Sequence, residues 1–187
     1  TDDGAGCAAS LCERLRAQGG RPILLRLDGP ESPAQGIYAE DLTDPARVQE
    51  LIGRIRRDHG TIGGLVHLLP LRPVPAMQDL AAPAFERLVD QEVKGLFYLL
   101  RYAAADLKGS PGAWVAACLS FGSAAIDGVL PTPANPWRGG IIGVIKTVTV
   151  EWPEAVAKSL VLEEPTAELA IARILAARLS EVLGQQI

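Results

Sequence analysis

Residues 62–69 read Ile-Gly-Gly-Leu-Val-His-Leu-Leu, a nearly continuous apolar run of strand length. Such a run is typical of a strand that is buried on both faces of a parallel sheet. Apolar runs at residues 22–27, 113–119 and 158–162 predict three further strands, and residues 37–40 predict a shorter one. The run at residues 62–69 therefore indicates the interior of a sheet whose other strands are spread along the chain.

Amphipathic segments separate these predicted strands. Val48, Leu51, Ile52 and Ile55 are spaced i, i+3, i+4, i+7, which predicts a helix with one buried face. Apolar periodicity also predicts helices at residues 7–18, 84–107, 139–152 and 167–183, and three prolines predict a loop at residues 120–136. The alternation predicts an α/β fold, a Rossmann-like doubly wound parallel sheet with right-handed crossovers. The 187 residues suit a single domain, and no segment resembles a linker.

The composition excludes several function classes. The net charge is −4 and no long basic block occurs, which argues against binding to nucleic acid or to an anionic membrane. Three cysteines and two histidines in no motif support neither a disulfide scaffold nor a metal site. No apolar run reaches the roughly 20 residues of a membrane span. We expect a cytoplasmic protein that holds no metal.

The start of the chain is unusual for this fold. Residues 1–6 read Thr-Asp-Asp-Gly-Ala-Gly and run directly into the first predicted helix. In a doubly wound sheet such a glycine turn follows the first strand, which lies in the middle of the sheet. No such strand precedes Thr1 in this sequence. We therefore expect a piece of a larger polypeptide, and we expect an upstream segment or another chain to supply a strand next to Thr1.

Several short motifs occur in a specific order behind the glycine turn: Ala-Glu-Asp-Leu-Thr-Asp at residues 39–44, Gly-Gly-Leu-Val-His-Leu at 63–68, Val-Lys-Gly-Leu-Phe at 93–97 and Ala-Trp-Val at 113–115. In this order they resemble the short-chain dehydrogenases/reductases, over almost the whole chain. The Thr-Asp-Asp-Gly start, combined with residues 139–147 and Glu-Trp-Pro at 151–153, resembles more narrowly the ketoreductase domains of type I polyketide synthases and polyunsaturated fatty acid synthases.

The resemblance implies an NADPH-dependent reductase of β-ketoacyl thioesters, with an acyl carrier protein and neighbouring synthase domains as partners. It implies that Gly4 and Gly6 approach the cofactor pyrophosphate, that Arg26 pairs with the 2′-phosphate and that Asp41 meets the adenine. Each residue also has a purely structural interpretation. The glycines can form a tight turn that binds nothing, Arg26 can be a solvated strand-end residue, and Asp41 can cap a helix.

The resemblance also implies a catalytic set, from which this sequence departs. These reductases use a serine, a tyrosine as general acid and a lysine that lowers the tyrosine pKa. Ser120 matches the serine, but the tyrosine position falls at Ala134 and the residue four further on is Arg138. Glu92 matches the position that carries asparagine or an active-site lysine in the family. No tyrosine follows Tyr102, so a shifted alignment cannot supply one.

Two lysines and one histidine are further candidates for catalysis. Lys94 and Lys146 could replace the family lysine, but both positions also suit solvated residues on amphipathic helices. His67 ends an apolar strand, where a histidine is more often a buried, hydrogen-bonded core residue than a catalytic acid.

Two functions remain open from the sequence. One is an NADPH-dependent β-ketoacyl reductase domain, supported by Ser120, Arg26 and Asp41. The other is a degenerate structural domain that organises neighbouring synthase domains without turnover, supported by Ala134, Arg138, Glu92 and the altered glycine turn. In that turn Asp2 and Asp3 take glycine positions of the family, and their carboxylates would repel a phosphate. A stand-alone short-chain dehydrogenase is a weaker third reading, because no Tyr-x-x-x-Lys motif occurs.

Overall fold

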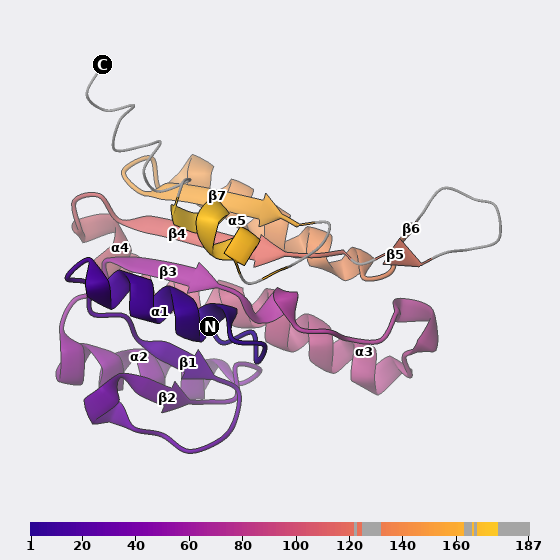
Figure 1. The fold of residues 1–187 in the computed structure, drawn as a ribbon, viewed down its shortest axis with the longest axis horizontal. Coiled ribbons are helices and arrows are strands. Elements are labelled where there is room, and N and C mark those ends of the chain that lie inside the picture. Colours follow the sequence, from indigo (N-terminus) through magenta and orange to yellow (C-terminus); the bar gives the residue numbers. More distant parts are fainter. Residues whose placement is uncertain (122, 125–131, 163–165, 167, 176–187) are drawn as a thin grey trace.

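The structure is a computed structural model of the 187-residue chain. It describes residues 1–121, 123–124, 132–162, 166 and 168–175. The remaining residues are drawn in grey in Figure 1.

The strands form parallel groups, as predicted. β1 (Leu24–Arg26) pairs in parallel with β2 (Ile37–Ala39), and β4 (Trp114–Leu119) pairs in parallel with both β3 (Gly64–His67) and β7 (Val156–Val161). Figure 1 shows β1 and β2 below β3, and β4 and β7 above it. The spatial order β2, β1, β3, β4, β7 is the doubly wound order 3-2-1-4-5-6 with its first-strand position left out, so the predicted fold class is confirmed.

The helices separate the strands along the chain. They are α1 (Cys7–Ala17), α2 (Pro45–His59), α3 (Ala82–Val89), α4 (Gly95–Gly109) and α5 (Gly139–Glu151). The α2 helix begins where the sequence predicts, because Pro45 takes its first position and the Asp44 carboxylate accepts hydrogen bonds from the N–H groups of Ala46 and Arg47. Its predicted apolar stripe is fully buried.

Helices cover both faces of the sheet. On one face α2, α4 and α5 pack against alternate strand residues such as Leu25, Val115 and Ala117. On the other face α1 packs against residues of opposite parity such as Leu24 and Cys118. Side chains of successive strand residues point to opposite faces, so a strand covered on both sides has to be apolar throughout.

Two predicted elements differ from the structure. The helix predicted over residues 84–107 is interrupted by a π-helical turn at Asp90–Lys94, which joins α3 to α4. The loop predicted over residues 120–136 contains a short antiparallel pair, β5 (Ser123–Ala124) and β6 (Thr132–Pro133). Of the closing helix predicted over residues 167–183, residues 168–175 are helical and the others lie outside the described residues.

The parallel strands form two groups that are divided between β1 and β3. β1 and β3 do not pair with each other, and residues 1–3 lie between them. The N–H of Asp2 donates to the carbonyl oxygen of Leu25 in β1 at 2.7 Å, and the Thr1 amino group donates to the carbonyl oxygen of Val66 in β3 at 2.6 Å. The carboxyl end of a central strand position is therefore occupied by the first residues of the chain.

Candidate functional site

The glycine turn leads into α1 at the carboxyl end of the sheet, where doubly wound folds bind ligands. Gly4 and Gly6 both adopt positive φ, at 68° and 97°, a conformation that favours glycine. The carboxylate of Asp3 folds back over the turn and accepts hydrogen bonds from the N–H groups of Ala5 at 3.1 Å, Cys7 at 3.3 Å and Ala8 at 2.8 Å. Asp3 is only 2% exposed.

Asp3 thus occupies the place that an anion would take. The first N–H groups of a helix have no partner within the helix, and together with the helix dipole they make an anion-binding site. In α1 these donors already meet a buried carboxylate from the chain itself. A dinucleotide pyrophosphate at the same turn would find its donors taken and would face a negative charge. The residues present do not fit the phosphate group.

Arg26 lies at the carboxyl end of β1 and Asp41 lies just beyond that of β2, and both have partners. Arg26 ends β1, and its Nε donates to the Asp2 carboxylate at 3.1 Å. Asp41 follows β2 and accepts hydrogen bonds from the backbone N–H and the hydroxyl of Thr43 at 3.0 and 2.8 Å. The backbone hydrogen bond from Thr43 is the largest cause that lowers the Asp41 pKa. Asp2 therefore neutralises the cation proposed for a 2′-phosphate.

A second cluster lies at the positions that the resemblance assigns to catalysis. Glu92 and Arg138 form a buried ion pair in which Nη2 meets Oε1 and Nε meets Oε2, each at 2.8 Å. The exposed fractions are 0% for Glu92 and 2% for Arg138. The Trp137 indole N–H also donates to the Glu92 carboxylate, at 3.0 Å. The bidentate geometry holds both charged groups in one fixed arrangement.

The same arginine binds the strand end that carries Ser120. Its Nη1 donates to the Ser120 carbonyl oxygen at 2.6 Å, and its Nη2 also donates to the Arg72 carbonyl oxygen at 3.1 Å. Ser120 is buried at the end of β4. The structure thus brings together three positions that sequence analysis aligned with a catalytic set, namely Ser120, Glu92 and Arg138.

Local backbone geometry explains how Glu92 reaches this place. The π-helical turn at Asp90–Lys94 buries Gln91 and Glu92. Gly140, at the start of α5, approaches this turn so closely that an added Cβ would lie 3.0 Å from Val93. α5 and the π turn are therefore in close contact, which brings Arg138 and Trp137, just before α5, beside Glu92.

His67 lies under this cluster and is a buried core residue, as predicted. Its Nε2 lies 2.9 Å from the Glu92 carbonyl oxygen, and its Nδ1 lies 3.2 Å from the Thr1 hydroxyl. Since a carbonyl only accepts, Nε2 carries the proton and Nδ1 accepts from the hydroxyl. Burial is the main cause that lowers the His67 pKa, to about 3. A neutral histidine with both nitrogens engaged links β3 to the π turn.

The other candidates lie outside the cluster. Lys146 is exposed on α5, and Lys94 is exposed and paired with Asp90 at 2.6 Å. Ala134 is half-buried, and its carbonyl oxygen accepts a hydrogen bond from the N–H of Met77. Sequence reasoning did not predict the roles of Asp3 and Trp137. A signal for Asp3 was present, because an aspartate shortly before a helix is a common partner of its first N–H groups.

The fold is shared with several solved structures. Solved structures with the same arrangement include an oxidoreductase (short chain dehydrogenase/reductase) from Brucella ovis, with a TM-score of 0.72 and 13% identity over 93% of this chain and 88% of that chain. The ligand-free aldohexose dehydrogenase of Thermoplasma acidophilum has a TM-score of 0.66 and 18% identity over 82% of this chain and 60% of that chain. The fold is that of the short-chain dehydrogenases/reductases, and this resemblance is confirmed.

At the level of sequence the chain is similar to the hybrid PKS-NRPS synthetase mycA of Thermothelomyces thermophilus. The two are 30% identical over 105 residues, which cover 49% of this chain and 3% of the synthetase. This similarity supports the narrower resemblance to a ketoreductase domain of a polyketide synthase. The chain spans a small fraction of that relative's length. No known family profile matches the sequence.

Two further structures show what this fold binds elsewhere. A short chain dehydrogenase from Burkholderia cenocepacia was solved in complex with NADP (TM-score 0.62, 16% identity, 83% of this chain and 69% of that chain). A short chain oxidoreductase from Pseudomonas aeruginosa, described as containing an atypical catalytic center, was solved with NADPH bound (TM-score 0.65, 14% identity, 84% of this chain and 66% of that chain).

Within the described part of the chain, the His, Cys, Asp and Glu side chains form no group able to hold a metal ion. The helices there are too short or too polar to cross a membrane.

Proposed function

We propose that this chain is a catalytically silent ketoreductase-like domain of a polyketide or polyunsaturated fatty acid synthase, which organises neighbouring synthase domains in the cytoplasm and does not reduce acyl-carrier-bound β-ketoacyl thioesters. The Asp3 carboxylate carries this proposal. It lies on the α1 N–H donors that a dinucleotide phosphate would need. Without a bound nicotinamide no hydride reaches a substrate, whatever the other residues do.

The Glu92–Arg138 pair supports the same function independently. At the positions of the family's polar catalytic groups, the two charged side chains saturate each other and hold the Ser120 carbonyl. An arginine guanidinium keeps its proton in proteins, so Arg138 cannot act as an acid. With alanine at position 134, this cluster offers no general acid for an alkoxide. Its rigid, buried contacts serve to join β4, the π turn and α5.

A reducing compartment agrees with the cysteines. Cys7, Cys12 and Cys118 are buried thiols, and burial raises the pKa of Cys7 to about 11 and that of Cys118 to about 12. Such thiols are poor nucleophiles and poor metal ligands.

NADPH fluorescence titration of the purified chain tests the nucleotide half of the proposal. We expect no saturable change up to millimolar NADPH, and no NADPH oxidation after addition of an acetoacetyl thioester of N-acetylcysteamine. The double variant Asp2→Gly/Asp3→Gly, which frees the α1 donors and Arg26, should gain measurable NADPH binding. Saturable binding by the unchanged chain, followed by thioester-dependent NADPH oxidation, would restore the reductase as the function.

The full-length synthase tests the organising role. Ser120→Ala, which keeps the carbonyl that Arg138 binds, should leave product formation unchanged. Glu92→Ala, which leaves Arg138 buried without its partner, should lower the yield of assembled synthase and its product together. A loss of product with Ser120→Ala, in a synthase that assembles normally, would argue for a catalytic serine and against this proposal.

A further inference from the structure

Helix α5 exposes apolar side chains to solvent. Its residues 139–151 read Gly-Gly-Ile-Ile-Gly-Val-Ile-Lys-Thr-Val-Thr-Val-Glu, with charged side chains only at Lys146 and Glu151. A helix that is apolar on nearly all sides is normally buried in a protein. The buried residues of α5 are only Ile141, Ile145 and Val148. The Val150 side chain is 81% exposed, so one side of this apolar helix has no partner among the described residues.

The two threonines of α5 make this side suitable for burial. The Thr147 hydroxyl donates to the Gly143 carbonyl oxygen at 3.1 Å, and the Thr149 hydroxyl donates to the Ile145 carbonyl oxygen at 3.0 Å. Hydroxyls that bond to the preceding turn of their own helix do not depend on water for a partner. A molecule that covers α5 would therefore leave neither hydroxyl without a hydrogen bond.

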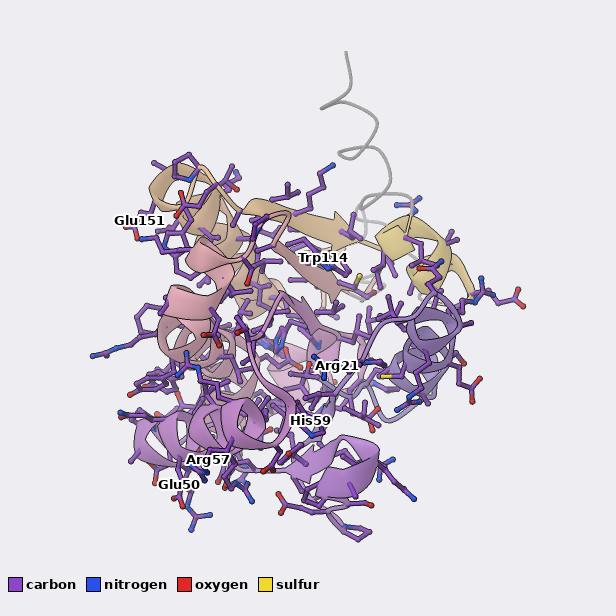
Figure 2. All side chains as sticks on the ribbon, turned by 90° about the vertical axis from the view of Figure 1, so that its left-hand side faces the viewer. Arg21, Glu50, Arg57, His59, Trp114 and Glu151 are labelled. Carbon is purple, nitrogen blue, oxygen red and sulfur yellow. The ribbon has the colours of Figure 1, made fainter. Side chains whose placement is uncertain are left out.

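Helix α4 lies beside α5 from one end to the other. At the start, a Cβ added to Gly140 would lie 3.0 Å from Val93, which just precedes α4. At the other end, the Lys108 Nζ lies 5.7 Å from the centre of the Trp152 ring, which just follows α5. Figure 2 shows α5, which ends at the labelled Glu151, above α4 and α2 on one side of the sheet. The exposed residues of α4 and α5 thus form one surface.

The centre of this surface is apolar on both helices. Phe97 of α4 is 48% exposed, and on a helix it shares a side with Arg101, four residues further on. Thr147 and Val150 share a side of α5 in the same way. We define the docking face by six exposed residues, namely Phe97, Arg101 and Lys108 of α4 with Lys146, Thr147 and Val150 of α5.

The docking face is positively charged, although the whole chain has a net charge of −4. Arg101, Lys108 and Lys146 form no ion pair with a described residue. Of the acids on the two helices, Asp106 is paired with Arg56, and Glu151 is exposed at the end of α5. Apolar residues with unpaired cations beside them fit a partner whose apolar residues are flanked by carboxylates.

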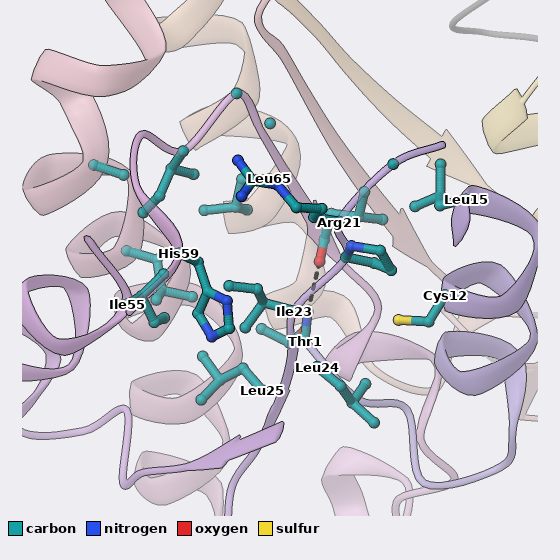
Figure 3. A pocket seen from close by; sticks show the side chains of 18 of the residues that line it. Thr1, Cys12, Leu15, Arg21, Ile23, Leu24, Leu25, Ile55, His59 and Leu65 are labelled. Carbon is teal, nitrogen blue, oxygen red and sulfur yellow. Dashed lines mark hydrogen bonds between the residues drawn. The ribbon is translucent and has the colours of Figure 1, made fainter. Parts of the chain in front are cut away.

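Other occupants fit this surface less well. A second copy of the same face would bring cations opposite cations, which opposes association. A small molecule needs a concave site. The cavity in Figure 3 lies elsewhere, between β1 and β3, and the described residues that line it include Ile23, Leu25 and Leu65 but none of α5. A helix fits well, because the small residues Gly143 and Thr147 allow its main chain to approach α5 closely.

We propose that the docking face binds an acidic amphipathic helix of a neighbouring synthase domain, an inference that rests on the proposed organising function. Apolar residues of the partner helix, spaced three or four apart, pack on Phe97, Thr147 and Val150. Its carboxylates pair with Arg101 on one side and with Lys146 on the other. Such binding buries α5 on the side that the described chain leaves open.

Zero-length cross-linking of the full-length synthase tests the docking face. A carbodiimide activates a carboxylate, and a lysine amine in contact with it displaces the activating group to form an amide bond. We expect mass spectrometry to find Lys146 joined to an aspartate or glutamate in a helix of another domain. Lys158 lies on β7, outside the docking face, and should give no such link. Lys146→Arg keeps the charge but removes the amine, so it should abolish the link and leave the synthase assembled.

A matched pair of valine variants tests the apolar centre. Val150→Asp should lower the yield of the Lys146 link by at least about 10-fold, because it places a carboxylate at the centre of the interface. Val161→Asp changes a valine that is 40% exposed on β7 and should leave the yield unchanged. Both side chains are exposed, so the thermal midpoint of the 187-residue chain should shift by at most about 2 °C in either variant.

The outcomes separate this proposal from the proposed function. Links from Lys146 only to its own domain, to a second copy of the chain or to a segment that is not helical would overturn the docking face. An unchanged link in Val150→Asp would do the same. NADPH turnover together with the expected link would refute the catalytic silence and retain the docking face. The absence of both turnover and link would refute the docking face alone.

Discussion

The Arg138 guanidinium binds the Glu92 carboxylate through two 2.8 Å hydrogen bonds, with both side chains withdrawn from water. The net contribution of such a pair to stability differs from the cost of removing one of its two partners. Its attraction roughly offsets the cost of burying two charges, but removing one partner leaves the other buried and uncompensated. The pair is therefore a strong constraint on the fold even where it adds little net stability.

Arg138→Met should lower the free energy of unfolding by about 3–5 kcal/mol, because it leaves the Glu92 charge buried alone. Urea denaturation followed by circular dichroism measures the change. The double variant Arg138→Met/Glu92→Gln should lose clearly less than the sum of the single variants. Arg26→Met, which breaks a partly exposed pair with Asp2, is the control and should cost at most about 1 kcal/mol. Additive losses from the two buried partners would contradict the interpretation.

His67 makes the free energy of unfolding depend on pH between 6.5 and about 3. Its folded-state pKa is about 3, and its ordinary value is 6.5. Between these values the unfolded chain binds a proton that the folded chain does not, so stability falls as pH decreases from 6.5 toward 3. The histidine contributes up to ~1.4 kcal/mol per pH unit in that window. Urea denaturation of the chain and of His67→Gln at several pH values measures the difference, and parallel pH profiles would contradict the prediction.

Asp3 and Asp2 are neighbours whose substitutions should destabilise the fold by different amounts. Asp3→Ala removes three backbone hydrogen bonds at the start of α1 from a buried site, so it should cost about 1–2 kcal/mol. Asp2→Ala removes one partly exposed ion pair and one turn hydrogen bond, so it should cost at most about 1 kcal/mol. Thermal unfolding of both variants under the same conditions gives the comparison. A larger loss for Asp2→Ala would reverse the assigned roles.

Two helical glycines form a matched pair. An added Cβ at Gly95 would lie 2.9 Å from the Cβ of Leu42, whereas one at Gly143 meets nothing within 4 Å. Gly95→Ala should therefore lower the free energy of unfolding by about 1–3 kcal/mol through overpacking. Gly143→Ala should raise it by up to about 1 kcal/mol, because alanine favours the helix. Chemical denaturation tests both, and a stabilising Gly95→Ala would show that α4 does not approach Leu42 this closely.

The sequence predicted those elements whose side chains repeat with a simple period. Val48 and Ile55 marked the buried face of α2, and the run at residues 62–69 contained β3. The π turn at Asp90–Lys94 was missed, because one extra residue per turn hardly disturbs an apolar pattern counted over a long helix. Its effect on Glu92 appears only when the helix packs against α5.

The sequence predicted which positions would lie in the candidate site, but not how their side chains would interact. Counting along the chain placed Ser120, Glu92 and Arg138 at corresponding positions of one site, and the structure brings them together. That the two charges would bind each other depends on packing between elements 46 residues apart, which no local pattern contains. For Asp3, the sequence indicated repulsion of a phosphate. It did not indicate that the carboxylate turns inward and takes the phosphate's donors.

The inward turn of Asp3 has a consequence for the protein in a living cell. An enzyme that binds its nucleotide only in the native state gains stability as the nucleotide concentration rises, so starvation or oxidative stress can weaken it. Under the proposed function, this domain contains its own substitute for the bound anion. Its lifetime would then be independent of the nicotinamide supply, and a synthase built around it would keep its architecture when the active reductases have lost their cofactor.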